Sequence, residues 1–224
     1  MSSMPPERVQ RAPFGTTTGE LASGLLAKVF GLLAFSFAAS AVGGLVGYRL
    51  SPSWFLPLIL VEFGLIFAVQ RMREREGWNV ALLYTFTFVS GMTLGPIIAA
   101  YTSAGLGLVV LQAAGVTAAM TVGLSFYALG TKRDLSGLQT YVFLGLLGLI
   151  VASVANIWVG GPALYALLSW GGALLFSVLL VFDVNRTRRA EDTLGNAVVI
   201  TLGIYLDIVN LFLFILRILS GNRR

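Results

Sequence analysis

Three carboxylates lie inside apolar stretches of this sequence. Glu62 interrupts "FLPLILVEFGLIFAVQR", Asp183 stands near the end of "LLFSVLLVFDVNR", and Asp207 lies in the middle of "ITLGIYLDIVNLFLFILRIL". An ionisable side chain deep in a membrane span costs roughly 2.5–3.5 kcal/mol on insertion scales, and it faces protein or water rather than lipid. These acids are therefore the first candidates for a functional site.

Asp183 and Asp207 could act as a pair. They fall on consecutive apolar segments joined by a short loop, so the two helices should be antiparallel neighbours. Asp207 lies about 18 Å along its helix, so the carboxylates meet if the preceding helix runs further or the last one begins higher. Two buried carboxylates cannot both ionise cheaply and can share a proton near neutral pH. They also offer a transient calcium site, because calcium takes six to eight oxygen ligands. Asn210 shares a helix face with Asp207.

A basic residue stands at the same expected membrane edge as Asp183. Arg73 follows Glu62 by eleven residues, which places both on one stripe of a helix, about 20° from eclipsed and roughly 16 Å apart. Arg73 could pair with Asp183 and act as a latch. Alternatively, Arg71, Arg73 and Arg75 are all simple anchors on the cytoplasmic side. We assign no function to Arg217 near the end of the last helix.

The composition is that of an all-α polytopic membrane protein. The 224 residues are 57% hydrophobic and 11% charged, against about 25% charged in soluble domains. Cysteine and histidine are absent, which excludes disulfides, thiolate chemistry and imidazole metal sites. Seven apolar segments have spanning length. They cover residues 24–47, 54–72, 79–101, 107–130, 137–159, 163–184 and 195–219.

The rest of the sequence indicates one membrane domain with a tail at each end. We expect a disordered tail at 1–20, the seven-helix domain at 21–221 and a short tail at 222–224, with Asp192 or Thr193 capping the last helix. Basic residues gather in alternate loops, which fits anionic lipid better than nucleic acid. We expect a multi-pass protein of the cell membrane, with the N-terminus cytoplasmic and the C-terminus outside. The cytoplasmic set is Arg8, Arg11, Arg71, Arg73, Arg75, Lys132, Arg133, Arg186, Arg188 and Arg189, against Arg49, Arg223 and Arg224.

The order of several motifs resembles the Bax-inhibitor family of transmembrane proteins, especially its bacterial calcium-leak members. The motifs are "YTFTFVSGMTLGP", "VFDVNR" and the block from Tyr205 to Gly221. The resemblance covers about residues 25–220. It implies a bundle in which the last of seven helices is central and the other six surround it. It also implies a pH-sensitive calcium leak, with calcium as the permeant ion and no cofactor.

The resemblance also implies roles for individual residues. Asp183 and Asp207 would be the paired aspartates that bind protons and, transiently, calcium. Arg73 would be the latch, although the neighbouring arginines leave open which one reaches the aspartates. The pore-lining polar positions would be Glu62, Asn156 and Asn210.

Other functions remain possible from the residues alone. An intramembrane aspartyl protease is disfavoured, because Asp207 stands in "GIYLD" rather than "GxGD" and no "PAL" follows it. We therefore do not expect an enzyme. A proton-coupled transporter would more often show an internal repeat. A non-transporting regulator that binds other membrane proteins in stress or protease control stays open as an alternative.

Overall fold

The computed structural model describes residues 18–221, and these form seven α-helices with two short 3-10 turns. All seven are long and apolar enough to span a membrane, so the predicted all-α polytopic fold is confirmed. The expected tails fall largely at 1–17 and 222–224, outside the described residues. The helices are α1 Thr18–Gly47, α2 Phe55–Arg71, α3 Trp78–Ser103, α4 Gly107–Gly130, α5 Gln139–Val159, α6 Pro162–Arg186 and α7 Leu194–Gly221.

Loop residues fix where several helices begin. Gly77 (φ 81°) precedes α3, and Gly161 (φ 105°) precedes α6. Only glycine adopts such backbone angles without strain. The hydroxyl of Thr193 accepts a hydrogen bond from the backbone N–H of Asn196 (3.1 Å), as an N-cap does. Of the two caps proposed for the last helix, Thr193 is the one in place.

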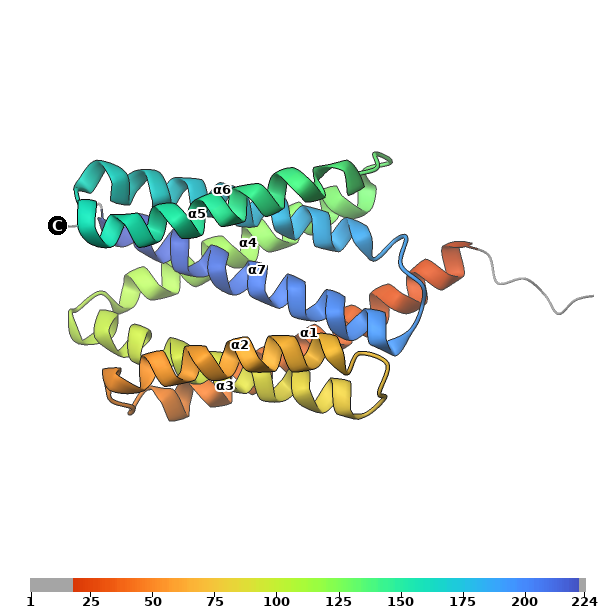
Figure 1. Ribbon diagram of the computed structural model, residues 1–224, viewed down its shortest axis with the longest axis horizontal. Coiled ribbons are helices and arrows are strands. Elements are labelled where there is room, and N and C mark those ends of the chain that lie inside the picture. The colour runs from red at the N-terminus through yellow and green to blue at the C-terminus, as the bar shows by residue number, and fades with distance from the viewer. Residues whose placement is uncertain (1–17, 222–224) are drawn as a thin grey trace, which may run out of the picture.

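Helix α7 runs through the middle of the bundle. Figure 1 shows it passing obliquely between α1–α3 on one side and α5 and α6 on the other, while α4 crosses it. It packs against α6, α1 and α4 most extensively. Its buried side chains cover more than half of the helix circumference at 100° per residue, and the central position predicted for it is confirmed. They include Ala197, Val198, Ile200, Thr201, Leu202, Ile204, Tyr205, Asp207, Ile208, Leu211, Ile215 and Leu216.

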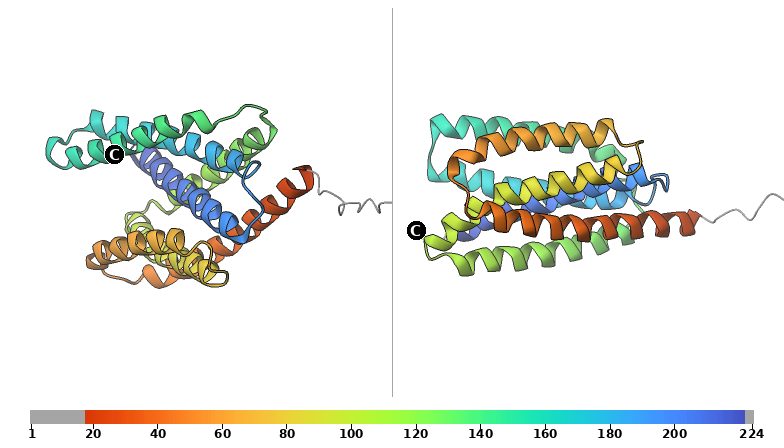
Figure 2. Two further views of the ribbon diagram at one scale, coloured as in Figure 1. Left: turned by 45° about the vertical axis from the view of Figure 1, so that its right-hand side comes forward. Right: turned by 90° about the horizontal axis from the view of Figure 1, so that it is seen from below.

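Helices α1 and α3 form the closest pair, and they lie side by side in both views of Figure 2. Glycine allows this approach. A Cβ added at Gly43 would collide with the carbonyl of Phe88, and one added at Gly91 would collide with the carbonyl of Ser40. Small residues at such crossings let membrane helices pack backbone to backbone. The α1–α3 contact therefore holds the first half of the bundle together.

The loops α2–α3, α4–α5 and α6–α7 lie at the same end of the bundle, which we call the basic end (Figure 1). Ion pairs join neighbouring segments there. Lys28 of α1 binds Asp192 of the α6–α7 loop at 2.9 Å, and Arg189 of that loop binds Asp134 of the α4–α5 loop. The α6–α7 loop is thus tied to both halves of the bundle.

Candidate functional site

Asp183 of α6 and Asp207 of α7 are brought together in the core of the bundle. The Asp183 carboxylate lies against α7 where a Cβ of Gly203 would stand. Asp207 follows Gly203 by four residues and therefore lies one turn further on the same helix face. The two carboxyl groups are close enough to interact electrostatically. Residues 24 positions apart in the sequence thus form one acidic pair.

Two local features of the sequence make this meeting possible. Helix α6 continues to Arg186, two residues beyond the expected end at 184, so Asp183 is held inside a regular helix. Gly203 has no side chain, so the carboxylate can approach the backbone of α7. The short loop and the Thr193 cap then start α7 antiparallel to α6.

Asp207 is the more enclosed member of the pair. It is 4% exposed, and its Oδ2 atom has no hydrogen-bond partner among the described residues. Buried polar atoms in folded proteins are almost always hydrogen-bonded. An acceptor left without a donor in this position is suited to a proton, a water molecule or a cation.

A pocket of about 460 Å³ opens beside Asp183, and we call it the Asp183 pocket. Arg73 and Arg186 of α6 both line it together with Asp183. Helix α2 ends at Arg71, so Arg73 lies in the α2–α3 loop and not on the helix stripe that the sequence predicts for it with Glu62. Arg186 interacts electrostatically with Asp183. The nearest carboxylate to Arg73 is that of Glu74, at 3.5 Å. Arg73 is thus placed in the same pocket as Asp183, and the direct ion pair between them stays a prediction.

The backbone of Arg73 is firmly held. The side-chain amide of Asn79 donates a hydrogen bond to the Arg73 carbonyl at 2.8 Å. The same carbonyl lies against Gly195, where a Cβ would collide with it. Neither Arg71 nor Arg75 lines the Asp183 pocket. Among the three arginines of this loop, Arg73 is therefore the one whose position is fixed beside the acidic pair.

The other expected polar residues lie elsewhere. Glu62 accepts a hydrogen bond from Thr93 of α3 and does not line the Asp183 pocket. The Asn210 amide donates to the carbonyl of Leu206 in its own helix at 2.8 Å. Asn156 lines a second pocket, and its buried Oδ1 has no partner among the described residues. The structure therefore does not gather Glu62, Asn156 and Asn210 into one lining.

The pair does not amount to a closed metal site. Within residues 18–221, acidic side chains do not gather in groups of three or more that could hold an ion. Calcium prefers six to eight oxygen ligands, so Asp183 and Asp207 would supply part of its shell and leave the rest to water and backbone carbonyls. Such a site suits an ion in passage better than one in storage.

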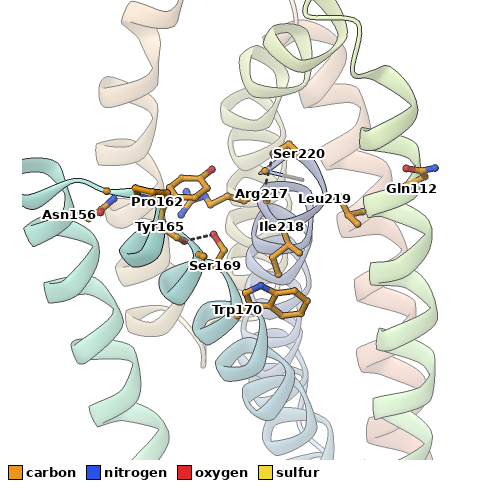
Figure 3. Close-up of a pocket in the computed structure, with 13 residues that line it drawn as sticks. Gln112, Asn156, Pro162, Tyr165, Ser169, Trp170, Arg217, Ile218, Leu219 and Ser220 are labelled. Carbon is orange, nitrogen blue, oxygen red and sulfur yellow. Dashed lines mark hydrogen bonds between the residues drawn. The ribbon is translucent and has the colours of Figure 1, made fainter. Parts of the chain in front are cut away.

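Two basic residues near these pockets were not assigned a role from the sequence. From the sequence, Arg186 is only one of the basic residues on the expected cytoplasmic side. It follows Asp183 by three residues, however, and this spacing places both on one face of α6. Arg217 lines the second pocket, where it lies over the ring of Tyr165 (Figure 3). It also lies over the ring of Phe214. Nothing in the local sequence around Arg217 indicates the contact with Tyr165, because Tyr165 is on another helix.

Comparison with known proteins identifies a family model and several bacterial proteins that are similar to this chain. A family model described as "Inhibitor of apoptosis-promoting Bax1" matches residues 22–224. An uncharacterised membrane protein of Vibrio cholerae is 32% identical over 199 residues, covering 88% of each chain. The inner membrane protein YbhL of Escherichia coli K12 is 32% identical over 178 residues, covering 75% of this chain and 74% of its own.

Proposed function

Because the chain belongs to the family of inhibitors of apoptosis-promoting Bax1, we propose that it is a calcium leak channel gated by protonation of Asp183 and Asp207. Calcium is the permeant ion, and the channel needs no catalytic step and no cofactor. The seven spanning helices make the chain a multi-pass membrane protein. The name of its Escherichia coli relative supports placing it in the inner membrane.

The contact of Asp183 with α7 beside Asp207 is the observation that carries this proposal. Two carboxylates at the interface of α6 and α7 repel each other when both are ionised, and the repulsion is strong where water is scarce. A shared proton removes the repulsion and holds the helices together. Loss of that proton drives them apart, so proton binding and helix separation are coupled.

The charged groups around the pair define the gate. Arg73 faces the Asp183 pocket from the α2–α3 loop, and Arg186 faces it from α6. When the pair holds a proton, Arg73 and Arg186 close the pocket at the basic end. When the proton leaves, the freed carboxylates attract calcium and the helices separate. Glu62 stands apart on α2, bound to Thr93, and would meet an ion that enters from outside before the ion reaches this gate.

The charge distribution supports one orientation. The loops of the basic end, with the helix ends beside them, hold eight of the fifteen basic residues, and such loops remain on the cytoplasmic side. The gate then lies toward the cytoplasm, with the C-terminus outside. Calcium would enter from outside along α7 and pass Asp207 before it reaches the Asp183 pocket.

Calcium flux into proteoliposomes tests the proposal. The purified protein is reconstituted with a calcium dye inside, and flux is followed between about pH 6 and about pH 8, where a shared proton should be released. We expect wild-type flux to rise with pH, and Asp183→Asn and Asp207→Asn to lose that rise. Glu76→Gln in the exposed α2–α3 loop is the matched control.

Several outcomes would contradict the proposal. One is a wild-type flux no greater than that of empty vesicles. Another is an unchanged flux and pH response in both aspartate variants. If a variant without flux still restored the phenotype of a deletion strain, the chain would act as a non-transporting regulator.

A further inference from the structure

The second pocket lies at the end of the bundle opposite the Asp183 pocket. It measures about 1060 Å³, and thirteen residues line it. They come from the start of α6, the end of α7, the end of α5 and the first turns of α4. We call it the Arg217 pocket, because Arg217 is the only formally charged residue among those thirteen.

Aromatic rings hold the Arg217 side chain in place. Its guanidinium carbon lies 5.4 Å from the centre of the Tyr165 ring and 5.3 Å from that of Phe214. Figure 3 shows Arg217 reaching from α7 toward Tyr165 on α6. A guanidinium that lies over an aromatic ring still has its N–H donors free in the guanidinium plane. An oxyanion in that plane can accept hydrogen bonds from two of these donors.

The positive charge has no anionic partner in the described part of the chain. None of the three ion pairs found within residues 18–221 involves Arg217. Its guanidinium contacts the two rings, and the hydroxyl of Ser220 donates a hydrogen bond to the backbone carbonyl of Arg217 and not to its side chain, at 3.0 Å. Helix α6 also begins in this pocket, at Gly161 and Pro162, and a helix N-terminus favours negative charge.

A buried acceptor accompanies the positive charge. Asn156 lines the Arg217 pocket, and its Oδ1 atom is enclosed without a hydrogen-bond partner in residues 18–221. A ligand that carries both an oxyanion and a hydroxyl group would satisfy the two residues together. A phosphate ester with a hydroxylated headgroup has this chemistry.

The pocket borders the lipid side of the bundle. Trp170 lines it and is 65% exposed, and Trp158 on the neighbouring α5 is 77% exposed. Tryptophan is enriched where spanning helices meet lipid headgroups. The volume is at the upper end of that of ordinary ligand sites, so the pocket can take a headgroup together with the first part of its acyl chains.

We propose that the Arg217 pocket binds a phosphate group, with the guanidinium of Arg217 as its main ligand. The group can be carried by a phospholipid or arrive as free phosphate, and these two sources are separable by experiment. This site is distinct from the acidic pair, and its existence does not depend on the leak proposed above.

Native mass spectrometry of the full-length protein tests the proposal with three probes. They are phosphatidylglycerol, a diacylglycerol with the same acyl chains, and inorganic phosphate. We expect phosphatidylglycerol to bind wild-type protein, and Arg217→Gln to weaken this by about tenfold or more, as the loss of charged hydrogen bonds would. Arg49→Gln is the control, since Arg49 is exposed and lies at the same end of the bundle.

The probes separate the possible outcomes. Arg217-dependent binding of phosphatidylglycerol without binding of inorganic phosphate identifies a lipid site, and binding of inorganic phosphate alone identifies an anion site. Both outcomes support the proposal. Equal binding of diacylglycerol and phosphatidylglycerol overturns it, as does an unchanged affinity in Arg217→Gln. Should that variant fold poorly, Arg217→Lys serves instead, because it keeps the charge but loses the planar donors, and should weaken phosphate binding less.

Discussion

The carboxylate of Asp183 rests against Gly203 of α7, in the space that a side chain at that position would occupy. Asp207 lies one helical turn beyond Gly203 on the same face. The glycine therefore makes the room in which the two acids meet. A residue without chemistry of its own thus decides whether the acidic pair can form.

Gly203→Ala should disturb the pair without removing either acid. The added methyl group would displace the Asp183 carboxylate, which is the flexible end of a side chain, so the stability cost should lie near the low end of the roughly 1–3 kcal/mol for overpacking. We expect a changed pH profile of calcium flux with a small loss of thermal stability. Gly171→Ala on α6 is the control, because its Cβ would meet no atom within 4 Å. An unchanged profile in Gly203→Ala would show that the contact has no role in gating.

Arg73 should differ from its two neighbours. It alone of Arg71, Arg73 and Arg75 lines the Asp183 pocket, so its loss removes positive charge from the gate. We expect Arg73→Gln to raise calcium flux at about pH 6, where the gate is otherwise closed. Arg71→Gln and Arg75→Gln have the same change in charge and should leave that flux unchanged. Equal effects of all three variants would identify the arginines as membrane anchors only.

Gly91 should be essential for packing. A Cβ there would collide with the backbone of α1 at Ser40, and backbone cannot move aside as a side chain can. We expect Gly91→Ala to destabilise the protein by about 1–3 kcal/mol, seen as a lower melting temperature in detergent. Gly44→Ala is the control, since its Cβ would make an ordinary contact of 3.6 Å with the carbonyl of Gly91. Equal melting temperatures for the two variants would contradict the proposed close approach.

The Tyr205 hydroxyl should contribute to the central position of α7. It is fully buried and donates a hydrogen bond to Ser40 of α1 at 2.8 Å. Tyr205→Phe should lower the free energy of unfolding by about 0.5–1.5 kcal/mol, the usual worth of such a bond. In a double-mutant cycle with Ser40→Ala the two losses should not add. Tyr127→Phe, at an exposed position, should have no effect.

The sequence predicts the seven spans well because hydropathy and length are local properties. The observed ends of the helices fall within a few residues of the predicted ones, except at α1, which begins at Thr18 rather than near Gly24. The sequence could also identify Asp183 and Asp207 as a pair, since ionisable residues are rare inside spans.

Other features depend on how the helices pack, and the sequence could not show them. The role of Gly203 depends on which face of α7 meets α6. The aromatic contacts of Arg217 join α6 and α7 at a distance of about fifty residues in sequence. Glu62, Asn156 and Asn210 looked alike as polar residues in apolar segments, yet they lie at three separate places in the bundle.

The most direct test of the central claim is the pH profile of calcium flux in Asp207→Asn, Asp183→Asn and the double variant. If the two acids act as one proton-binding unit, either single change should abolish the rise of flux with pH, and the second should add nothing. A rise in Asp207→Asn as steep as in the wild type, or a double variant equal to the sum of the two single ones, would contradict the account.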